Sequence, residues 1–408
     1  MRPPDSRPPA GRNRARSIAM AGLCAIAAGP AAAAGWTPVL GLGTRLDDRR
    51  GPGGDPERLT TAILAPEIRF EAEQGRSGLR LMARRDFLLE GDEPRQWRPA
   101  WAANATDRAS MHAELIGSPW TGLALEGGYL RSRDALDLDR LTALSPGRAA
   151  YWTGSGRATT WLAEGALEAK GWAYDAKERS DALAISWSAV ALPWRGPDNA
   201  WLFGWRQSEV GIDERRVVRS DVATFGVRHR LSPGLSAQLE AGGSLVAWDD
   251  GARRRGPALA FSLRGPEAGE GLSIDLLHQP GYATNTRAEW SRWLGNGLLS
   301  ARWESQVDAQ GGIDRGPDLT RRLSLGARDT LDRATVIGLE ASHSRSRPLR
   351  LRGADAQLFR ASGWVARHLR QGLSARCGYS FLTDRPAAAG SGWRRGRGRV
   401  DAALTVVL

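Results

Sequence analysis

Apolar and polar residues alternate along the last segment of the chain. Every second position there is apolar, at Val400, Ala402, Leu404, Val406 and Leu408. A period of two predicts a β-strand with one apolar face. Such a strand needs a partner along each edge, and a closed barrel supplies one by pairing the last strand with the first. We therefore expect the last strand to pair with a first strand at Trp36–Leu46, which would close the barrel.

Alternating segments of about ten residues recur through the chain, separated by turn residues. The clearest pair is 223–231 and 235–241, joined by Ser232-Pro233-Gly234, a combination typical of turns. The same form returns around Leu294-Gly-Asn-Gly297 and around Gln371-Gly372. This pattern predicts an all-β protein, a transmembrane up-and-down barrel of antiparallel strands.

Short and long connections alternate in order along the second half of the chain. We expect short turns near 231–234, 265–270, 294–297, 329–333 and 370–372, and longer polar loops near 248–257, 279–286, 307–318, 344–354 and 382–398. Outer-membrane barrels have short periplasmic turns and long extracellular loops. The strand count is therefore predicted as about 16–20, with 20 if Glu164-Gly165 is a turn.

A soluble β-sandwich or propeller is the alternative, because both also combine short strands with Gly and Pro turns. No propeller-type motif repeats in the sequence, and the connections alternate in length where a propeller would keep them uniform. The sequence therefore favours a transmembrane barrel over a soluble sandwich or propeller.

The N-terminal segment has the layout of a secretory signal peptide. Five arginines within residues 2–16 precede a short apolar segment, 18–28, and Ala31–Ala34 follow as small residues suited to cleavage. The apolar run is too short for a stable spanning helix, although an uncleaved anchor is the alternative. We predict a cleaved signal at 1–34, a barrel at 35–408, and a location in the outer membrane of a Gram-negative bacterium.

Charge decides which face of each strand points to lipid. An arginine that faces lipid at the bilayer midplane costs about 2–4 kcal/mol, so charged positions of the strands should face the lumen. The predicted lumen-facing residues are Arg228, Glu240, Arg264, Asp275, Arg302, Glu304, Arg322, Glu340 and Arg376. Tryptophans near expected strand ends would form an interfacial girdle, at Trp120, Trp194, Trp248, Trp293 and Trp303.

Catalytic and metal-binding patterns are weak. The five histidines fall on separate hairpins without metal-ligand spacing, so no metal, cofactor or catalytic residue is assigned. Ser342-His343-Ser344 with Glu340 invites comparison with barrel-embedded lipid hydrolases, in which a serine, a histidine and an acid act together. Polar residues where a strand meets a loop are more often a solvated rim, and we predict that the chain is not an enzyme.

Basic segments are prominent in the expected external loops. The chain carries a formal net charge of +12, and arginines cluster at Arg253–Arg255, Arg345–Arg352 and Arg394–Arg399. Arginine pairs with phosphate in a bidentate manner, and lipopolysaccharide of the outer leaflet is rich in phosphate. Nucleic acid is the alternative partner for so basic a chain. Patches spread over separate loops at a membrane surface favour lipid and argue against nucleic acid.

The phrases Val227–Gly242 and Leu373–Tyr379 resemble those of the broad group of outer-membrane β-barrel proteins found beside exopolysaccharide and surface-protein-sorting genes in Gram-negative bacteria. The chain departs from the usual barrel ending, because its last residue is Leu408 where phenylalanine is common. The resemblance implies insertion by the barrel assembly machinery and a role in passage or secretion of polysaccharide, and it supplies no catalytic residues.

A barrel of 16 or more strands leaves an aqueous lumen, and arginines in it favour anions. We therefore expect a porin-like channel, or an export-associated barrel, for a polysaccharide or a small anionic solute. The alternatives are a structural, partner-binding barrel without conductance and, with less support, a lipid-modifying enzyme.

Overall fold

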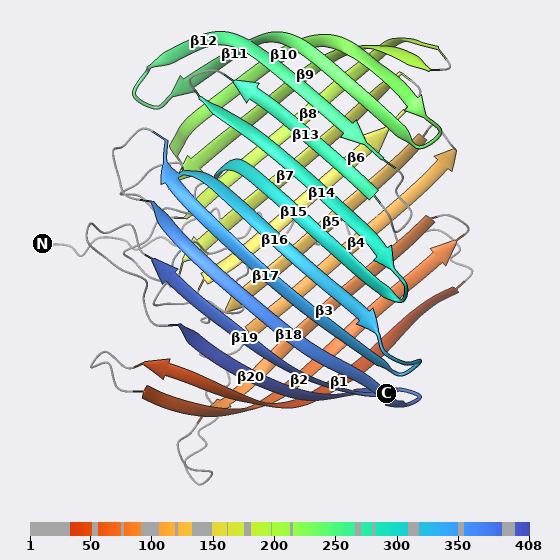
Figure 1. Cartoon of the computed structure of the whole chain (residues 1–408), viewed down its shortest axis with the longest axis vertical. Coiled ribbons are helices and arrows are strands. Elements are labelled where there is room, and N and C mark those ends of the chain that lie inside the picture. Colours follow the sequence, from red (N-terminus) through yellow and green to blue (C-terminus); the bar gives the residue numbers. More distant parts are fainter. Residues whose placement is uncertain are drawn as a thin grey trace, which may run out of the picture.

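The computed structural model describes residues 33–50, 56–74, 77–90, 106–118, 121–132, 149–160, 162–174, 181–196, 198–212, 215–265, 271–279, 282–308, 318–349, 355–385 and 396–408. Nearly all of them lie in twenty antiparallel strands (Figure 1). No helix in this part of the chain is long and apolar enough to cross a membrane. Residues 1–32, most of the predicted signal peptide, lie outside the described residues, and the first strand begins at Ala33.

The strands follow one another around the ring in chain order. They are β1(Ala33–Arg50), β2(Pro56–Gln74), β3(Ser77–Glu90), β4(Thr106–Ser118), β5(Thr121–Ser132), β6(Ala149–Thr159), β7(Ala163–Tyr174), β8(Ala182–Arg195), β9(Asn199–Ile212), β10(Arg215–Ser232), β11(Leu235–Trp248), β12(Arg253–Arg264), β13(Gly271–Gln279), β14(Ala283–Leu294), β15(Gly297–Asp308), β16(Asp318–Thr330), β17(Thr335–Pro348), β18(Ala356–Arg370), β19(Leu373–Arg385) and β20(Arg397–Val407). Each strand pairs with the strand before it and the strand after it.

The ring is closed by pairing of the first strand with the last. The register runs from Val39 opposite Val407 to Asp48 opposite Gly398, and the Leu408 N–H donates a hydrogen bond of 3.0 Å to the Pro38 carbonyl. The predicted all-β barrel is therefore confirmed, with twenty strands and with the segment Trp36–Leu46 inside the closing strand.

The connections differ in detail from those predicted. The hairpin near residue 164 exists, but its turn is residues 160–162, and Glu164 and Gly165 lie in β7. Two expected long loops are short connections. Residues 249–252 join β11 to β12, and residues 280–282 join β13 to β14. Polar residues such as Arg253 and Arg255 lie in strands because they continue the period of two and still find partners across the hairpin. We call the end of the barrel that carries connections 51–55, 91–105 and 309–317 the loop side, and the opposite end the turn side.

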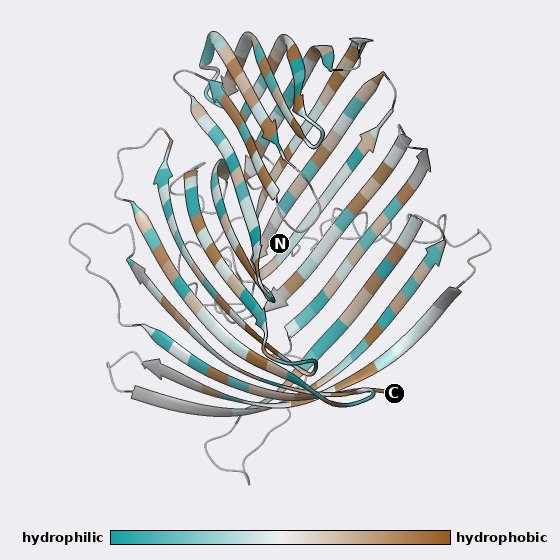
Figure 2. Ribbon diagram, turned by 45° about the vertical axis from the view of Figure 1, so that its right-hand side comes forward, coloured by the Kyte–Doolittle hydropathy of each residue, from teal (hydrophilic) through white to brown (hydrophobic). Residues whose placement is uncertain are grey.

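The period of two separates an apolar outer face from a polar inner face. Leu325, Leu339 and Phe203, which have outward-pointing side chains, are 51%, 63% and 55% exposed. On the inner face, Leu202, the chain neighbour of Phe203, and Glu240 of β11 are buried, at 0% and 1% exposure. Figure 2 shows this alternation of hydrophobic and hydrophilic positions along the strands. Large apolar side chains left exposed around a closed ring are expected where lipid is the solvent.

The barrel is narrow where β9–β12 curl over, at the top of Figure 1. Small and medium apolar residues of β8–β12 fill the inner face at this edge. Leu202 and Ala258 are 0% exposed, and Val190 and Ala260 are 8% and 5% exposed. The curl brings β10 and β12 close enough for direct contact although β11 lies between them. Side chains therefore occupy the inside of this edge of the barrel.

The predicted tryptophan girdle is wrong for two of its members. Trp194 and Trp303 lie on the outer face, but Trp248 and Trp293 lie on the inner face because their positions in the alternation turn them inward. Trp120 lies outside the described residues.

Candidate functional site: the inner face of the barrel

Cross-strand register places the nine charged residues singled out from the sequence on the face of the sheet opposite the exposed leucines, in three groups. The first is Arg228 and Glu240 on β10 and β11. The second is a band on β12–β16, and Glu340 of β17 continues it toward the turn side. This band contains Arg264, Asp275, Arg302, Glu304 and Arg322. Arg376 on β19 lies apart from both, beside β20 and β1.

Glu240 is the centre of a buried polar network at the narrow edge. Its carboxylate accepts hydrogen bonds from Arg206 Nη1 at 3.0 Å, from Arg206 Nη2 and from the Thr224 hydroxyl. Gln238 links Glu240 to Arg228, and Arg228 binds both carboxylate oxygens of Glu164 at 2.6 and 2.8 Å. The network therefore ties β7 to β11 through the inside of the curl.

Glycine is required beside this network. A Cβ at Gly204 would lie 2.5 Å from both the Glu240 carboxylate and the Thr224 hydroxyl oxygen, and one at Gly226 would lie 2.0 Å from the Leu239 carbonyl oxygen. The buried carboxylate can approach its partners only because these positions lack side chains.

We expect Glu240→Ala to destabilise the barrel by about 3–5 kcal/mol, because Arg206 would keep its charge in a buried site without its main partner. Urea unfolding in detergent micelles measures the change. Glu289→Ala is the matched control, since that glutamate also pairs with arginines but is half exposed, and it should cost much less. Equal losses for the two variants would contradict a special role for burial at Glu240.

The second group is a nearly balanced band of charge. Arg302 lies 2.6 Å from Glu304 and 3.2 Å from Glu289, Arg287 lies 2.9 Å from Glu289, and Arg264 lies 3.8 Å from Asp275. Most of these partners are two residues apart on one strand or directly opposed on the next. Opposite charges so arranged cancel most of the field that either would project into the lumen.

Arg376 belongs to a third group that is strongly basic. Its guanidinium lies 4.6 Å from the ring centroid of Trp364, and its charge interacts favourably with that of Asp401 and unfavourably with those of Arg108 and Arg84. Arg84 and Arg108 are themselves directly opposed on β3 and β4, and Arg84 is paired with Asp86 at 2.6 Å and with Glu67 at 3.6 Å.

The basic patch, as we call this third group, is the set of six arginines and three acids around Arg376 on the inner face of β1–β4 and β19–β20; Glu71, Glu73, Glu114 and Arg80 lie on the same face nearer the turn side and are not counted in it. Its members are Arg45, Arg69, Arg84, Arg108, Arg376, Arg399, Glu67, Asp86 and Asp401. Six positive and three negative charges leave a net of +3. Of the three groups, this one carries the largest net charge.

The sequence reasoning found Arg376 but missed the other members of the patch. It took Arg399 for part of an external loop, whereas β20 begins at Arg397 and Arg399 is 7% exposed and paired with Asp401 at 2.8 Å. A usable signal was present, since Glu67 and Arg69, Arg84 and Asp86, and Arg399 and Asp401 are opposite charges two positions apart. That spacing puts both members of a pair on one face of a strand.

An apolar cluster crosses the lumen toward the loop side. It contains Val210, Val218 and Val246 from β9–β11 together with Leu358 and Leu382 from β18 and β19. β10 and β18 are eight strands apart along the ring, so these side chains meet through the interior of the barrel. All five are below a tenth exposed. We call this set the cross-lumen cluster.

Polar and aromatic contacts accompany the cluster. Lys170 Nζ on β7 donates a hydrogen bond of 3.0 Å to Gln306 Oε1 on β15, again eight strands away. Tyr282, in the connection between β13 and β14, packs edge-on against Trp248 with ring centroids 6.0 Å apart. Burial raises the pKa of the Tyr282 phenol, which therefore stays neutral. The loop-side half of the lumen is narrowed by these contacts.

The hydrolase arrangement considered for Ser342, His343 and Ser344 is not formed. Ser342, Ser344 and Glu340 lie on the inner face, whereas His343 lies on the outer face and is exposed. Adjacent residues of a strand point to opposite faces, so this histidine cannot activate either serine. Among the described residues, no group of three or more His, Cys, Asp or Glu side chains is placed to hold a metal ion.

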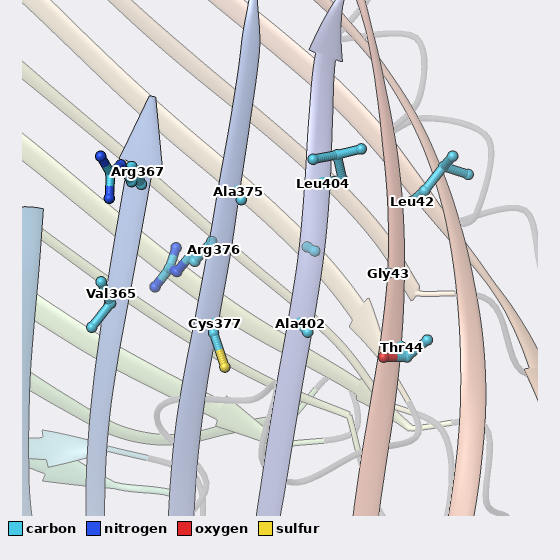
Figure 3. A pocket seen from close by; sticks show the side chains of 11 residues that line it. Leu42, Gly43, Thr44, Val365, Arg367, Ala375, Arg376, Cys377, Ala402 and Leu404 are labelled. Carbon is cyan, nitrogen blue, oxygen red and sulfur yellow. The ribbon is translucent and has the colours of Figure 1, made fainter. Parts of the chain in front are cut away.

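A depression of about 620 Å³ lies at the seam between β18, β19, β20 and β1. Figure 3 shows the small side chains of Ala375 on β19 and Ala402 on β20 beside the larger Leu404 and Leu42. The register puts these four on the outer, apolar face, and Cys377 beside them is free and exposed. The depression therefore faces lipid and is no part of the route through the barrel.

Comparisons with known proteins give only distant structural likenesses. No family model matches the chain, and no curated protein matches it. OccK2 of Pseudomonas aeruginosa is 12% identical with a TM-score of 0.39, covering 91% of this chain and 98% of that one. The outer-membrane protein OpdK of Pseudomonas aeruginosa is 10% identical with a TM-score of 0.38, covering 93% and 100%.

The FrpB iron transporter of Neisseria meningitidis is 10% identical with a TM-score of 0.42, covering 91% of this chain and 81% of that one. Likeness at this level carries no argument about function. The chain's own geometry does: a closed ring of twenty antiparallel strands with an apolar outside and a charged inside is the architecture of a barrel in the cell outer membrane.

Proposed function

We propose that the chain is an outer-membrane channel that accepts small anionic solutes and is closed toward the loop side by the cross-lumen cluster. The observation that carries the proposal is the basic patch, whose nine charged residues have a net charge of +3, whereas the Glu240 network and the band on β12–β16 are nearly neutral. A concentration of one sign of charge inside a low-dielectric wall attracts ions of the other sign.

The chemistry of the patch suits carboxylate or phosphate groups. Guanidinium offers paired N–H donors that match two oxygens of either group. Arg84 and Arg108 are opposed on neighbouring strands, and Arg376 approaches from β19, so three such forks line one side of the lumen. A carboxylate or phosphate of a solute would add to the acids already present, because the arginines of the patch outnumber them by three.

Export of an acidic polysaccharide through the same lumen is the finer form of this proposal, and it is supported only by the resemblance of the hairpin sequences to exopolysaccharide-associated barrels. Uptake and export require the same lumenal chemistry. Release of labelled surface polysaccharide from cells lacking the protein would decide the direction.

We expect neutralisation of the patch to lower anion selectivity. In Arg84→Gln/Arg376→Gln, the net charge of the patch falls from +3 to +1, so the preference for chloride over potassium should fall several-fold. The reversal potential across a planar bilayer with a salt gradient measures this preference.

Arg292→Gln/Arg367→Gln is the matched control, because both arginines lie on the outer face, of β14 and β18, and their loss removes the same two charges outside the lumen. Its reversal potential should equal that of the wild type. An unchanged reversal potential in the patch variant would refute the assignment of selectivity to these arginines.

We also propose that residues 1–34 are a cleaved signal peptide and that the barrel assembly machinery inserts residues 35–408. The charged start, the short apolar segment and Ala31–Ala34 support cleavage. The N-terminal sequence of the protein isolated from outer membranes tests it, and a start at Gly35 is expected.

A non-conducting structural barrel is the second candidate, and the cross-lumen cluster favours it. Contacts between walls eight strands apart are what a filled barrel would show. The two candidates differ in the conductance expected when the cluster is removed: a channel should conduct more, and a structural barrel should stay silent.

A further inference from the structure

Arginines point outward from the loop-side ends of β16 and β17. Arg321, Arg345 and Arg347 occupy the same outer face as Leu323, Leu325 and Leu339, further toward the loops. Along β17 the exposure alternates, so that Arg345 and Arg347 are exposed while Ser344 and Ser346 are buried. We call Arg321, Arg345 and Arg347 the outer arginine surface.

Charge on this surface is incompletely neutralised within the protein. Arg345 forms an ion pair with Asp355, its Nε donating a hydrogen bond of 2.6 Å. Within the described part of the chain, no hydrogen bond or ion pair holds Arg321 or Arg347. Arg321 and Arg345 are directly opposed partners on adjacent strands, which is unfavourable for like charges without an intervening anion.

The height of these arginines matches the edge of a bilayer. Ile337 is the first outward apolar residue after the β16–β17 turn, and Arg347 lies ten positions further along the strand. Ten residues rise roughly 34 Å along a strand, which at a tilt of about 45° is about 24 Å along the barrel axis. An apolar belt about 25 Å tall that starts near Ile337 therefore ends beside the outer arginine surface.

A second pair of outward arginines stands on the same rim. Arg253 and Arg255 are exposed on the outer face of β12, with the lipid-facing Leu259 and Phe261 below them toward the turn side. The arginines thus mark the loop-side boundary of the apolar belt on two separate hairpins.

We propose that the outer arginine surface binds phosphate groups of the phosphorylated glycolipid that forms the outer leaflet of the outer membrane. Arg321 and Arg345 are placed to share one phosphate, because their strands are adjacent and a bidentate guanidinium contact suits phosphate oxygens. The leucines below the arginines would contact the acyl chains of the same lipid. This site is outside the barrel and independent of the proposed channel.

Binding of bisphosphorylated lipid A to the folded full-length barrel in neutral detergent, followed by native mass spectrometry, tests the proposal. We expect one or more retained lipid A molecules on the wild type and at least a tenfold loss of affinity in Arg321→Gln/Arg345→Gln/Arg347→Gln. If the triple variant does not fold, Arg347→Gln alone should weaken binding several-fold, since no side-chain hydrogen bond or ion pair holds Arg347 within the described part of the chain.

The matched control is Arg292→Gln/Arg367→Gln, which removes outward arginines from the turn-side end of the same half of the barrel and should bind lipid A as the wild type does. Lipid A without its phosphates should bind weakly to every variant. Equal binding of lipid A to the wild type and the triple variant would overturn the proposal. So would equal retention of phosphatidylglycerol, or competition by millimolar inorganic phosphate alone, because either would show a general anion surface.

Discussion

Deletion of residues 399–408 should abolish insertion of the protein into the outer membrane. These residues form most of β20, which contributes ten register partners to β1 and ten to β19. Without them, the facing edges of β1 and β19 would present unpaired backbone N–H and C=O groups to lipid. Each unsatisfied group costs several kcal/mol there, because the bilayer core has no water to replace the lost partner.

Protease resistance and heat-modifiable migration of the protein in isolated outer membranes measure insertion. Deletion of Leu408 alone is the matched control: it lies beyond the end of β20 and removes a single hydrogen bond to Pro38, so insertion should persist. A stably inserted barrel after the longer deletion would mean that β1 and β19 can pair directly, and would contradict the required role of β20.

The second large effect is expected from Leu358→Ala/Leu382→Ala, which should raise single-channel conductance several-fold. The two leucines are the part of the cross-lumen cluster supplied by β18 and β19, and their removal leaves the valines of β9–β11 without partners across the lumen. An apolar constriction excludes water and ions, so widening it admits both. Conductance in planar bilayers measures the change.

Leu404→Ala is the matched control, because that leucine is exposed on the outer face of β20 and its truncation should leave conductance unchanged. If the double variant stays silent at high protein load, the barrel is non-conducting and the channel proposal fails. If the wild type already conducts as a fully open pore, the cluster is not a constriction.

The strands themselves could be predicted from the sequence because their signal is local. A period of two in apolarity, as along Val400–Leu408, depends only on residues that are neighbours in the chain. The same period assigns residues to faces, and the nine charged residues singled out from the sequence fall on the face opposite the exposed leucines. The same alternation places the His343 side chain on the opposite face of β17 from those of Ser342 and Ser344, so the sequence alone was sufficient to exclude the hydrolase arrangement.

Strand ends were less predictable than strands. The arginines at 253–255 were expected in a loop because they are polar, but a strand can continue past the membrane while it retains a partner. Arg399 was misplaced for the same reason, since its charge is neutralised inside the barrel by Asp401. Composition cannot distinguish a solvated charge from a paired one.

The sequence by itself determined that this chain forms antiparallel strands with an apolar and a polar face, because alternation is a property of adjacent residues. Only the tertiary structure decided which inner residues meet. The basic patch joins strands from both ends of the chain because β1 closes on β20, and the cross-lumen cluster joins strands eight apart because the ring is narrow enough for side chains to cross it. Contacts of that kind depend on the closure and curvature of the whole sheet, which no local pattern encodes.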